Sequence, residues 1–370
     1  MQRRQCLGLA GWAIAAGLGA CVRPRAETND VDAIVTRLPG GEHGAPAHDS
    51  IASALRAAAS SHKRPFRILI DAGHWYEKLV IDTPDVHFIG RGQAATRLHF
   101  DAAAGQLKPD GTPWGTWGCA TLIVRAPGFR AERMTIENSF DYLDHLIHPR
   151  LEQVGANGAQ AVALMLDQGA DRVLLEQVDL VGHQDTLFVD AGRSRFRDCR
   201  ISGSVDFVFG AGTALLHRCD VHSRFRPGKE RQGYVAAPST SLTRPQGLCF
   251  IDCTLSRDAD IPDRSVALGR AWRPTKVFPD GSRGDPDAVG AALFMRCRMD
   301  AHIAAEGWDP MAYSAGDGSR VMLEPRDARF FEFANHGPGA AAHLARPQLA
   351  AADAARIEHL LLSDDWIPNR

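Results

Sequence analysis

A short pattern of apolar and polar positions recurs along the chain. It consists of an aromatic or apolar residue, two variable residues, a small or apolar residue, a polar residue and an aliphatic residue, as in residues 196–201 and 250–255. The fourth positions of the repeats are Met134, Val178, Cys199, Cys219, Cys253 and Cys297. They are separated by 44, 21, 20, 34 and 44 residues. These intervals correspond to one or two turns of a unit of roughly 20–22 residues, with loops inserted in some turns.

Strands this short cannot bury an apolar face alone, so they need neighbours stacked on either side. The spacing therefore predicts an all-β fold, a right-handed parallel β-helix, which is a solenoid. A leucine-rich solenoid is disfavoured because no L-x-x-L-x-L-x-x-N unit occurs, and the period is about half that of a β-propeller blade. Residues 48–60 are predicted to form a helical N-terminal cap, and the Ala-rich residues 340–362 a helical or irregular C-terminal cover.

The first residues have the character of a targeting signal. Residues 1–21 combine a short basic start with an apolar stretch that is too short to span a membrane comfortably. The stretch ends Leu-Gly-Ala-Cys, which resembles a bacterial lipobox in which Cys21 is acylated and becomes the mature N-terminus. The alternative is an ordinary cleaved signal with a chance cysteine. Arg3 and Arg4 also resemble the start of a twin-arginine signal.

The leader leads to three expectations about domains and location. Residues 1–21 are a lipoprotein-type signal peptide, residues 22–45 a tether and residues 46–370 the folded domain. Val22 after the lipobox cysteine favours the outer membrane, so we expect an exported outer-membrane lipoprotein or, alternatively, a periplasmic or secreted protein. The lipid anchor is then the one expected contact with a membrane.

Composition and charge exclude several classes of protein. The chain has 370 residues, of which 45% are hydrophobic and 23% charged, so it is neither disordered nor collagenous. It contains 42 Lys and Arg and 44 Asp and Glu, so its net charge is −2. This charge does not indicate binding to nucleic acid. The six cysteines after Cys21 lack paired C-x-x-C spacing, so a zinc site is not expected.

Polar residues interrupt three apolar strands at a regular spacing. Gln160 begins an apolar strand, Gln184 and Asp185 adjoin the next, and Asp206 lies between Val205 and Phe207. Asp185 and Asp206 are 21 residues apart and the two glutamines 24, each close to one turn, so these side chains should cluster on adjacent strands about 4.8 Å apart. Two carboxylates so close cannot both ionise readily, which predicts an acid and a nucleophile. The alternative is an internal polar ladder that satisfies buried amides.

Several motifs occur in the same order as in the pectinesterase (pectin methylesterase) family, which the chain resembles over most of its length. They are residues 73–77 for G-x-Y-x-E, 160–164 for Q-A-V-A-L, 182–187 for G-x-Q-D-T-L, 206–210 for D-F-V-F-G, 268–272 for L-G-R-P-W and 335–339 for N-x-G-P-G. Two positions depart from the family pattern. Trp75 replaces the usual Tyr, and Ala271 replaces the usual Pro in the loop that bears Arg270 and Trp272.

The resemblance implies roles for individual residues. Asp206 would be the nucleophile and Asp185 the general acid and then base, while Gln184 and Gln160 would donate to the oxyanion and Arg270 would pair with Asp206. Substrate contacts are expected from Trp272, Thr116, Arg226, Tyr234, Phe209 and Thr275. Phe209 could instead be a core residue and Arg226 a solvated surface residue. His183 should face away from the dyad, because neighbouring residues of a strand point to opposite sides.

Cys199 and Cys219 lie 20 residues apart at equivalent positions of adjacent turns. We predict a disulfide between them, since export permits disulfides and the resemblance points to the same pair. The alternative is a stack of buried thiols that act as small apolar side chains.

The expected activity is hydrolysis of methyl esters in pectin or oligogalacturonide, by a monomer that uses no metal or other cofactor. An alternative keeps the fold and the dyad but changes the substrate to another ester or an acyl thioester. A β-helical glycosidase or lyase is disfavoured because a glycosidase does not need paired glutamines as oxyanion donors. A non-catalytic carbohydrate-binding solenoid is disfavoured because both aspartates are present. A serine hydrolase is disfavoured because the chain has no G-x-S-x-G motif.

Overall fold

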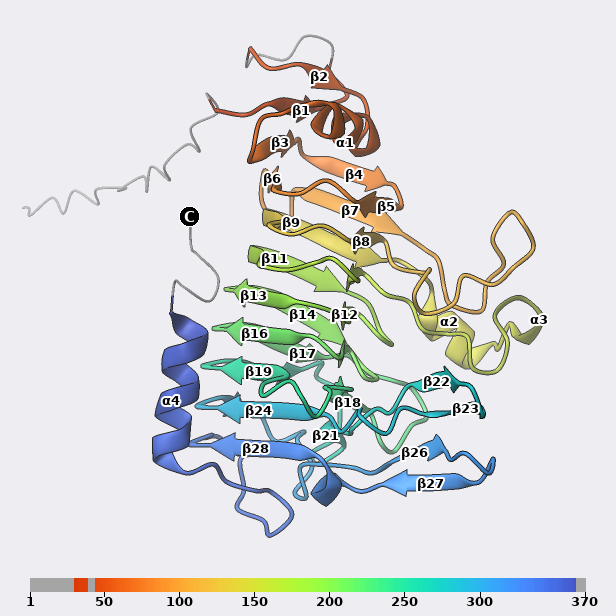
Figure 1. Cartoon of the computed structure of the whole chain (residues 1–370), viewed down its shortest axis with the longest axis vertical. Helices are drawn as coiled ribbons and strands as arrows, with labels where there is room; N and C mark the ends of the chain where they lie inside the picture. Colours follow the sequence, from red (N-terminus) through yellow and green to blue (C-terminus); the bar gives the residue numbers. More distant parts are fainter. Residues whose placement is uncertain (1–29, 39–43, 364–370) are drawn as a thin grey trace, which may run out of the picture.

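The computed structural model describes residues 30–38 and 44–363, and it is a right-handed parallel β-helix (Figure 1). The predicted fold class is therefore confirmed. The signal peptide, with the lipobox and Cys21, lies outside the described residues. None of the helices in the described part of the chain has the length and apolar character that a membrane span needs.

Two columns of short strands form one 17-stranded sheet, which is joined through the long strands β9 and β11. The first column contains β2 (Ala47–His48), β1 (Ala33–Val35), β3 (Phe66–Ile70), β6 (Val86–Gly90), β9 (Arg130–Asn138), β11 (Val173–Val181), β13 (Arg193–Arg197), β16 (Thr213–His217), β19 (Leu248–Ile251), β24 (Ala291–Met295) and β28 (Arg329–Phe333). The second contains β4 (Gly73–Tyr76), β7 (Thr96–Phe100), β9, β11, β14 (Arg200–Gly203), β17 (Asp220–Ser223), β20 (Thr254–Arg257) and β25 (Arg298–Met299).

A seven-stranded parallel sheet forms the other wall of the β-helix. Its strands are β5 (Leu79–Ile81), β8 (Leu122–Val124), β10 (Leu164–Leu166), β12 (Leu187–Val189), β15 (Val208–Gly210), β18 (Gly233–Pro238) and β21 (Val266–Gly269). Two antiparallel hairpins project beyond it, β22 (Thr275–Phe278) with β23 (Gly281–Gly284) and β26 (Met311–Ser314) with β27 (Arg320–Leu323). The remaining elements are α1 (Ile51–Ser60), α2 (Tyr142–Ile147), α3 (Leu151–Val154), α4 (Ala351–Leu362) and the 3-10 helix η1 (Pro325–Asp327).

The repeat seen in the sequence marks one corner of the β-helix, between the two columns of the large sheet. The six aligned residues are all buried at this corner, and the residue before each has a left-handed backbone conformation. These preceding residues are Arg133, Gln177, Asp198, Arg218, Asp252 and Arg296, with φ between 52° and 56°. A non-glycine residue in this region is uncommon, so its recurrence once per turn shows that the corner geometry is the same in each turn.

The structure does not contain the predicted disulfide between Cys199 and Cys219. All six cysteines of the described residues have free, buried thiols. Cys199 and Cys219 continue as a column through Cys253 and Cys297 on the following turns. The Cys199 Sγ donates to the Arg197 carbonyl oxygen at 3.3 Å and the Cys219 Sγ to that of Phe196 at 3.4 Å. With these carbonyl acceptors, the thiols fill the corner as small apolar side chains.

Helix α1 covers the N-terminal end of the β-helix, as the sequence predicts. Its first turn is held by Glu77, whose two carboxylate oxygens accept the backbone N–H groups of Ile51 at 2.8 Å and Ala52 at 2.9 Å. The side chain of Ser50 also accepts the Ser53 N–H at 3.3 Å. The acidic residue of the motif at residues 73–77 therefore has a structural role here, since it satisfies donors that a helix leaves unpaired.

The expected tether over residues 22–45 needs correction. Its apolar residues Ala33, Ile34 and Val35 form β1, which is buried and pairs with both β2 and β3. Because these three side chains are apolar, they gain more from joining the sheet than from exposure to water. The folded domain thus begins before residue 46.

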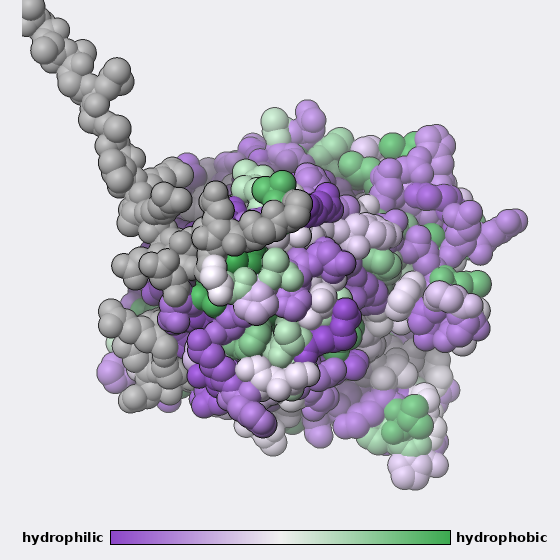
Figure 2. Space-filling view, turned by 90° about the horizontal axis from the view of Figure 1, so that it is seen from above, coloured by the Kyte–Doolittle hydropathy of each residue, from purple (hydrophilic) through white to green (hydrophobic). Residues whose placement is uncertain are grey.

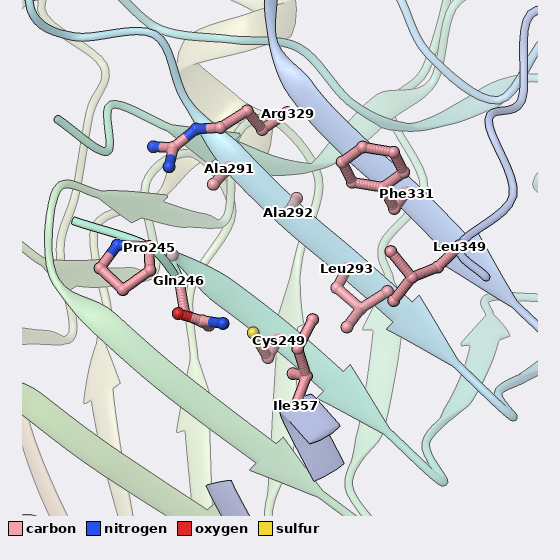
Figure 3. A pocket seen from close by; sticks show the side chains of 11 residues that line it. Pro245, Gln246, Cys249, Ala291, Ala292, Leu293, Arg329, Phe331, Leu349 and Ile357 are labelled. Atoms are coloured by element: carbon pink, nitrogen blue, oxygen red, sulfur yellow. The ribbon is translucent and has the colours of Figure 1, made fainter. Parts of the chain in front are cut away.

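Helix α4 covers a side of the β-helix and not its open end (Figure 1). Its residues Ala354 and Leu361 pack with Leu215 and Leu293 on the outer face of the large sheet. A hollow of about 110 Å³ remains between the helix and the sheet (Figure 3). The predicted C-terminal cover is therefore a lateral one.

The C-terminal end is fastened by a buried ion pair. The side chains of Arg346 and Glu332 are almost fully buried, and their closest N–O distance is 2.6 Å. In the motif at residues 335–339, the Asn335 side chain accepts the Cys297 N–H at 2.9 Å and donates to the Phe294 carbonyl at 3.1 Å. This motif is thus structural too.

Viewed from the opposite, α1 end, hydrophilic residues dominate the visible surface, with small groups of hydrophobic ones among them (Figure 2).

Candidate active site

Asp185 and Asp206 lie side by side on consecutive turns, immediately before β12 and β15. The register of these strands, Leu187 opposite Val208, puts the two aspartates in line. Both have left-handed backbone conformations, with φ of 65° and 50°, and both are 8% exposed. The sequence spacing thus predicts their proximity correctly. The shared left-handed conformation shows that the two residues occupy equivalent positions on their turns.

Arg270 forms a bidentate ion pair with Asp206. Its Nε and Nη2 donate to the two carboxylate oxygens of Asp206 at 2.9 and 2.7 Å. The guanidinium carbon lies 3.8 Å from the ring centroid of Tyr234, so a cation–π contact supports the same orientation. Ala271 in place of the usual proline does not remove this pair.

The carboxyl group of Asp185 is in a different environment. Burial and the neighbouring Asp206 carboxylate raise the pKa of Asp185 well above its usual value, and Arg270 opposes this only in part. Asp185 therefore keeps its proton at a pH where an ordinary aspartate would be ionised. One carboxyl group is held by an arginine and the other is protonated, which is the division that a nucleophile and a general acid require.

The two glutamines lie on neighbouring turns next to this pair. The Ala161 N–H donates to the Gln184 carbonyl oxygen at 3.1 Å, so the segments that carry Gln160 and Gln184 are adjacent. In the described part of the chain, neither side-chain amide has a hydrogen-bond partner, and both are partly exposed. Both amide groups are consequently free to donate to an oxygen of a ligand.

The buried side chain of Asn138 fixes the segment that follows Gln160, and its role was not predicted from the sequence. Its Nδ2 donates to the carbonyl oxygens of Ala102 at 2.8 Å, Val162 at 3.0 Å and Cys119 at 3.3 Å. These three carbonyls belong to three separate segments around the site. A lone asparagine at the end of a strand gives no signal in the sequence that would reveal this role.

An aromatic surface adjoins the carboxylates. The ring centroids of Trp272 and Phe209 are 5.7 Å apart. Phe209 stacks on Phe188, with ring centroids 4.1 Å apart. Phe209 is only 3% exposed, so it supports the surface from below, and Trp272 and the exposed Trp117, 6.0 Å apart, form its accessible part. Phe188 and Trp117 were not predicted from the sequence. Phe188 could have been found from its 21-residue spacing to Phe209.

The other residues predicted to contact the substrate differ in exposure and in their partners. Thr116 is partly exposed beside Trp117, and Thr275 is exposed at the first position of β22, three residues after Trp272. The Arg226 Nη1 donates to the Gln232 carbonyl at 3.3 Å, and its guanidinium lies beside the phenol of Tyr142. Arg226 is therefore not a fully solvated surface residue. Tyr234 lies against Arg270.

His183 is a structural residue, as expected. Burial, with a contribution from nearby arginines, lowers the pKa of His183 to about 3, so the ring is neutral. The ring stacks on Tyr142 with centroids 5.0 Å apart, and this contact packs the start of α2 against the residue before Gln184. Within residues 30–38 and 44–363, no group of three or more His, Cys, Asp or Glu residues is arranged to bind a metal ion.

Paired aspartates, an arginine partner and amide donors on a parallel β-helix are consistent with a carboxylic ester hydrolase, and the comparisons with known proteins show that class. The sequence profile of the Pectinesterase family matches residues 39–347, and the chain belongs to this family. Pectinesterase A from Dickeya dadantii is 37% identical over 323 residues, which cover 86% of this chain and 87% of that protein.

Solved structures of pectin methylesterases are also similar to this chain. Pectin methylesterase PemA from Erwinia chrysanthemi superposes with a TM-score of 0.86 and 38% identity, covering 93% of this chain and 99% of that chain. A pectin methylesterase in complex with a hexasaccharide has a TM-score of 0.87 and 37% identity, covering 92% of this chain and 99% of that chain.

Proposed function

We propose that this protein hydrolyses methyl esters of galacturonate in pectin or its oligomers. The observation that carries the proposal is the Arg270–Asp206 ion pair beside Asp185, whose pKa is raised by burial and by the Asp206 carboxylate. The sugar-bound structure of a similar pectin methylesterase supports an oligosaccharide as the substrate.

In the first half of the reaction, an Asp206 oxygen attacks the carbonyl carbon of the methyl ester. The negative charge that develops on the carbonyl oxygen is stabilised by N–H groups of Gln184 and Gln160, a type of interaction worth about 3–4 kcal/mol per donor. The C–O bond to the methoxy group then breaks, and Asp185 gives its proton to the leaving oxygen, so methanol departs. Asp206 is left acylated, as a mixed anhydride with the substrate carboxyl group.

In the second half, the ionised Asp185 takes a proton from a water molecule. The resulting hydroxide attacks the acyl carbon, and the bond to the Asp206 oxygen breaks. Asp206 regains its charge, Asp185 is protonated again, and the substrate leaves as a free carboxylic acid. Arg270 keeps one orientation of the Asp206 carboxylate ready for the next attack.

We propose that Trp272 and Trp117 stack on sugar faces, with Phe209 and Phe188 beneath them. Arg226 would bind the carboxylate of a galacturonate unit that has already lost its methyl group, and Thr116, Tyr234 and Thr275 would contact neighbouring units. Planar guanidinium groups suit carboxylates because they bind both oxygens. These contacts need no metal ion or cofactor, and the enzyme would act as a monomer.

The test measures methanol released from methyl-esterified oligogalacturonides and compares hydrolysis of aryl esters and acyl thioesters by the same preparation. Preference for the oligogalacturonides supports the proposal. Turnover of an aryl ester or thioester, with no methanol from any oligogalacturonide, would assign the site to a different acyl substrate.

The sequence of residues 1–21 also supports export as an outer-membrane lipoprotein acylated at Cys21. Several acyl chains bind a membrane far more firmly than one. The wild type should fractionate with membranes and need detergent for release, while Cys21→Ser should be soluble or remain unprocessed. Recovery of the wild type as a soluble periplasmic or secreted protein would contradict the lipid anchor and leave the esterase proposal intact.

A further inference from the structure

A second hollow, of about 520 Å³, lies outside the residues assigned to the reaction. Its walls come from the end of β7, the loop over residues 101–114 and helix α3. In Figure 1 this loop and the helices α2 and α3 project from the side of the β-helix. The polar and aromatic residues that line the hollow are Phe100, Trp114, Asp101, Glu152, Gln106 and Gln153. We call it the distal pocket.

The wall of the distal pocket is fixed to the segment that carries Gln160, before β10. The Ala104 N–H donates to the Gln160 carbonyl at 2.8 Å, and the Ala102 carbonyl accepts from Asn138 at 2.8 Å. The side chain of Gln106 accepts the Ala103 N–H at 2.7 Å, and its backbone carbonyl accepts the Trp114 N–H at 2.9 Å. The pocket is thus a preformed part of the fold, connected directly to the candidate active site.

The aromatic residues of the pocket continue the aromatic surface of the active site. Phe100 and Trp114 pack against the same apolar cluster as Phe188, Phe209 and Trp272. Their ring centroids are 6.4 Å apart in an edge-to-face arrangement, and Tyr76 extends the row at 4.9 Å from Phe100. The wall of the distal pocket and the aromatic surface of the active site therefore rest on one apolar cluster.

The charges around the pocket disfavour a free carboxylate as its occupant. Asp101 and Glu152 line it, and Asp101 already accepts the Tyr76 hydroxyl at 2.5 Å. Two cations lie nearby. Lys108 faces Asp110 at 3.7 Å, while Lys78 is held 5.0 Å from the Trp114 ring and donates to the Ala120 carbonyl, and burial lowers the pKa of Lys78 to about 8. Lys108 is thus paired with Asp110, and Lys78 with the Ala120 carbonyl and the Trp114 ring.

Given the proposed esterase function, we propose that the distal pocket binds an uncharged sugar unit of the substrate chain, a methyl-esterified galacturonosyl residue. The sugar face would lie against Phe100 or Trp114, and its hydroxyls would donate to Asp101 and Glu152. Leu107 and Pro109, also in the wall, offer apolar contact to the ester methyl group. A galacturonate in the same position would bring its charge beside two carboxylates, so the pocket directs the enzyme to stretches that are still esterified.

The first experiment varies substrate length with Trp114→Ala. Fully methyl-esterified oligogalacturonides from three units upward are assayed for methanol release by the variant and the wild type. We expect equal kcat/KM on the shortest oligomers and a loss of about tenfold above a threshold length, where the chain reaches the pocket. An equal loss at every length, or no loss at any length, would overturn the proposal.

The second experiment changes charge with Glu152→Lys and, as a matched control, Glu358→Lys on α4, on the other side of the β-helix. The readout is the ratio of kcat/KM for highly esterified pectin to that for sparsely esterified pectin. Glu152→Lys should lower this ratio several-fold, whereas the control should keep the wild-type ratio. An unchanged ratio in Glu152→Lys would contradict the assignment. A wild type that releases no methanol from any of these substrates would instead refute the proposed function itself.

Discussion

Arg270 holds both carboxylate oxygens of Asp206, through Nε at 2.9 Å and Nη2 at 2.7 Å. This bidentate contact makes two neighbouring aspartates chemically different. Asp206 has a charged partner, whereas burial and the Asp206 carboxylate raise the pKa of Asp185 well above its usual value. The β-helix places the two residues on consecutive turns, and the end of β21 supplies the arginine that distinguishes them.

Arg270→Lys tests whether the planar guanidinium matters beyond its charge. A lysine ammonium can approach one carboxylate oxygen but cannot hold both in one plane. We expect kcat to fall roughly 10- to 100-fold, with a smaller change in KM, since the contact orients Asp206 and does not bind the sugar. Methanol release measured over a range of substrate concentrations gives both constants. A wild-type kcat in Arg270→Lys would show that the orientation of Asp206 does not depend on the planar guanidinium group.

Asp185→Asn should make the folded protein more stable at neutral pH. The pKa of Asp185 is higher in the folded state than in the unfolded chain, so the folded state binds the proton more tightly. As pH rises above about 4, the unfolded chain ionises this group first, and wild-type stability falls until the folded-state pKa is passed. The asparagine variant lacks this loss, so its advantage should be small at pH 4 and grow with pH. Denaturant unfolding at several pH values checks this, and a constant difference would contradict it.

Gln184→Ala should reduce kcat by about 10²- to 10³-fold and leave KM nearly unchanged. The side-chain amide has no partner among the described residues, so its removal should cost little stability. Its donor is needed chiefly when negative charge develops on the carbonyl oxygen. Steady-state kinetics and a thermal melt on the same preparation separate the two effects. A rise in KM at constant kcat would mean that Gln184 binds the ground state.

Glu77→Ala should destabilise the N-terminal cap without affecting the chemistry. The Glu77 carboxylate accepts two backbone N–H groups of α1, and the loss should cost about 1–2 kcal/mol. Denaturant unfolding should show this loss, and kcat at 25 °C should match the wild type. The matched control is Glu230→Ala, an exposed residue for which we expect no change in stability. A catalytic defect in the folded Glu77 variant would argue for a role in the reaction.

The sequence predicts the β-helix and the proximity of the dyad because one physical feature, the 20- to 22-residue turn, determines both. Asp185 and Asp206 differ by one turn, so the repeat alone brings them together. Arg270 lies three turns beyond Asp185, and its partner could be assigned only through the family resemblance. The corner residues with positive φ, such as Arg133 and Arg218, could not be foreseen, because arginine has no preference for that conformation.

Other features depend on loops whose path the repeat does not determine. Asn138 joins carbonyls from three segments, and Trp117 reaches Trp272 from a loop that leaves the β-helix. The position of α4 along the side of the large sheet also depends on tertiary packing, since an Ala-rich helix fits an end or a side equally well. The sequence predicts that such a helix exists and does not indicate the surface it covers.

The most direct test of the proposed mechanism is methanol release from methyl-esterified oligogalacturonide by Asp206→Asn, with Asp198→Asn as the matched control. Both substitutions keep the shape of the side chain and remove its charge, but Asp198 lies at a corner of the β-helix and pairs with Arg218. We predict that Asp206→Asn folds and loses nearly all turnover, while Asp198→Asn keeps wild-type turnover. If folded Asp206→Asn retains a tenth or more of the wild-type rate, Asp206 is not the nucleophile and the proposed mechanism is wrong.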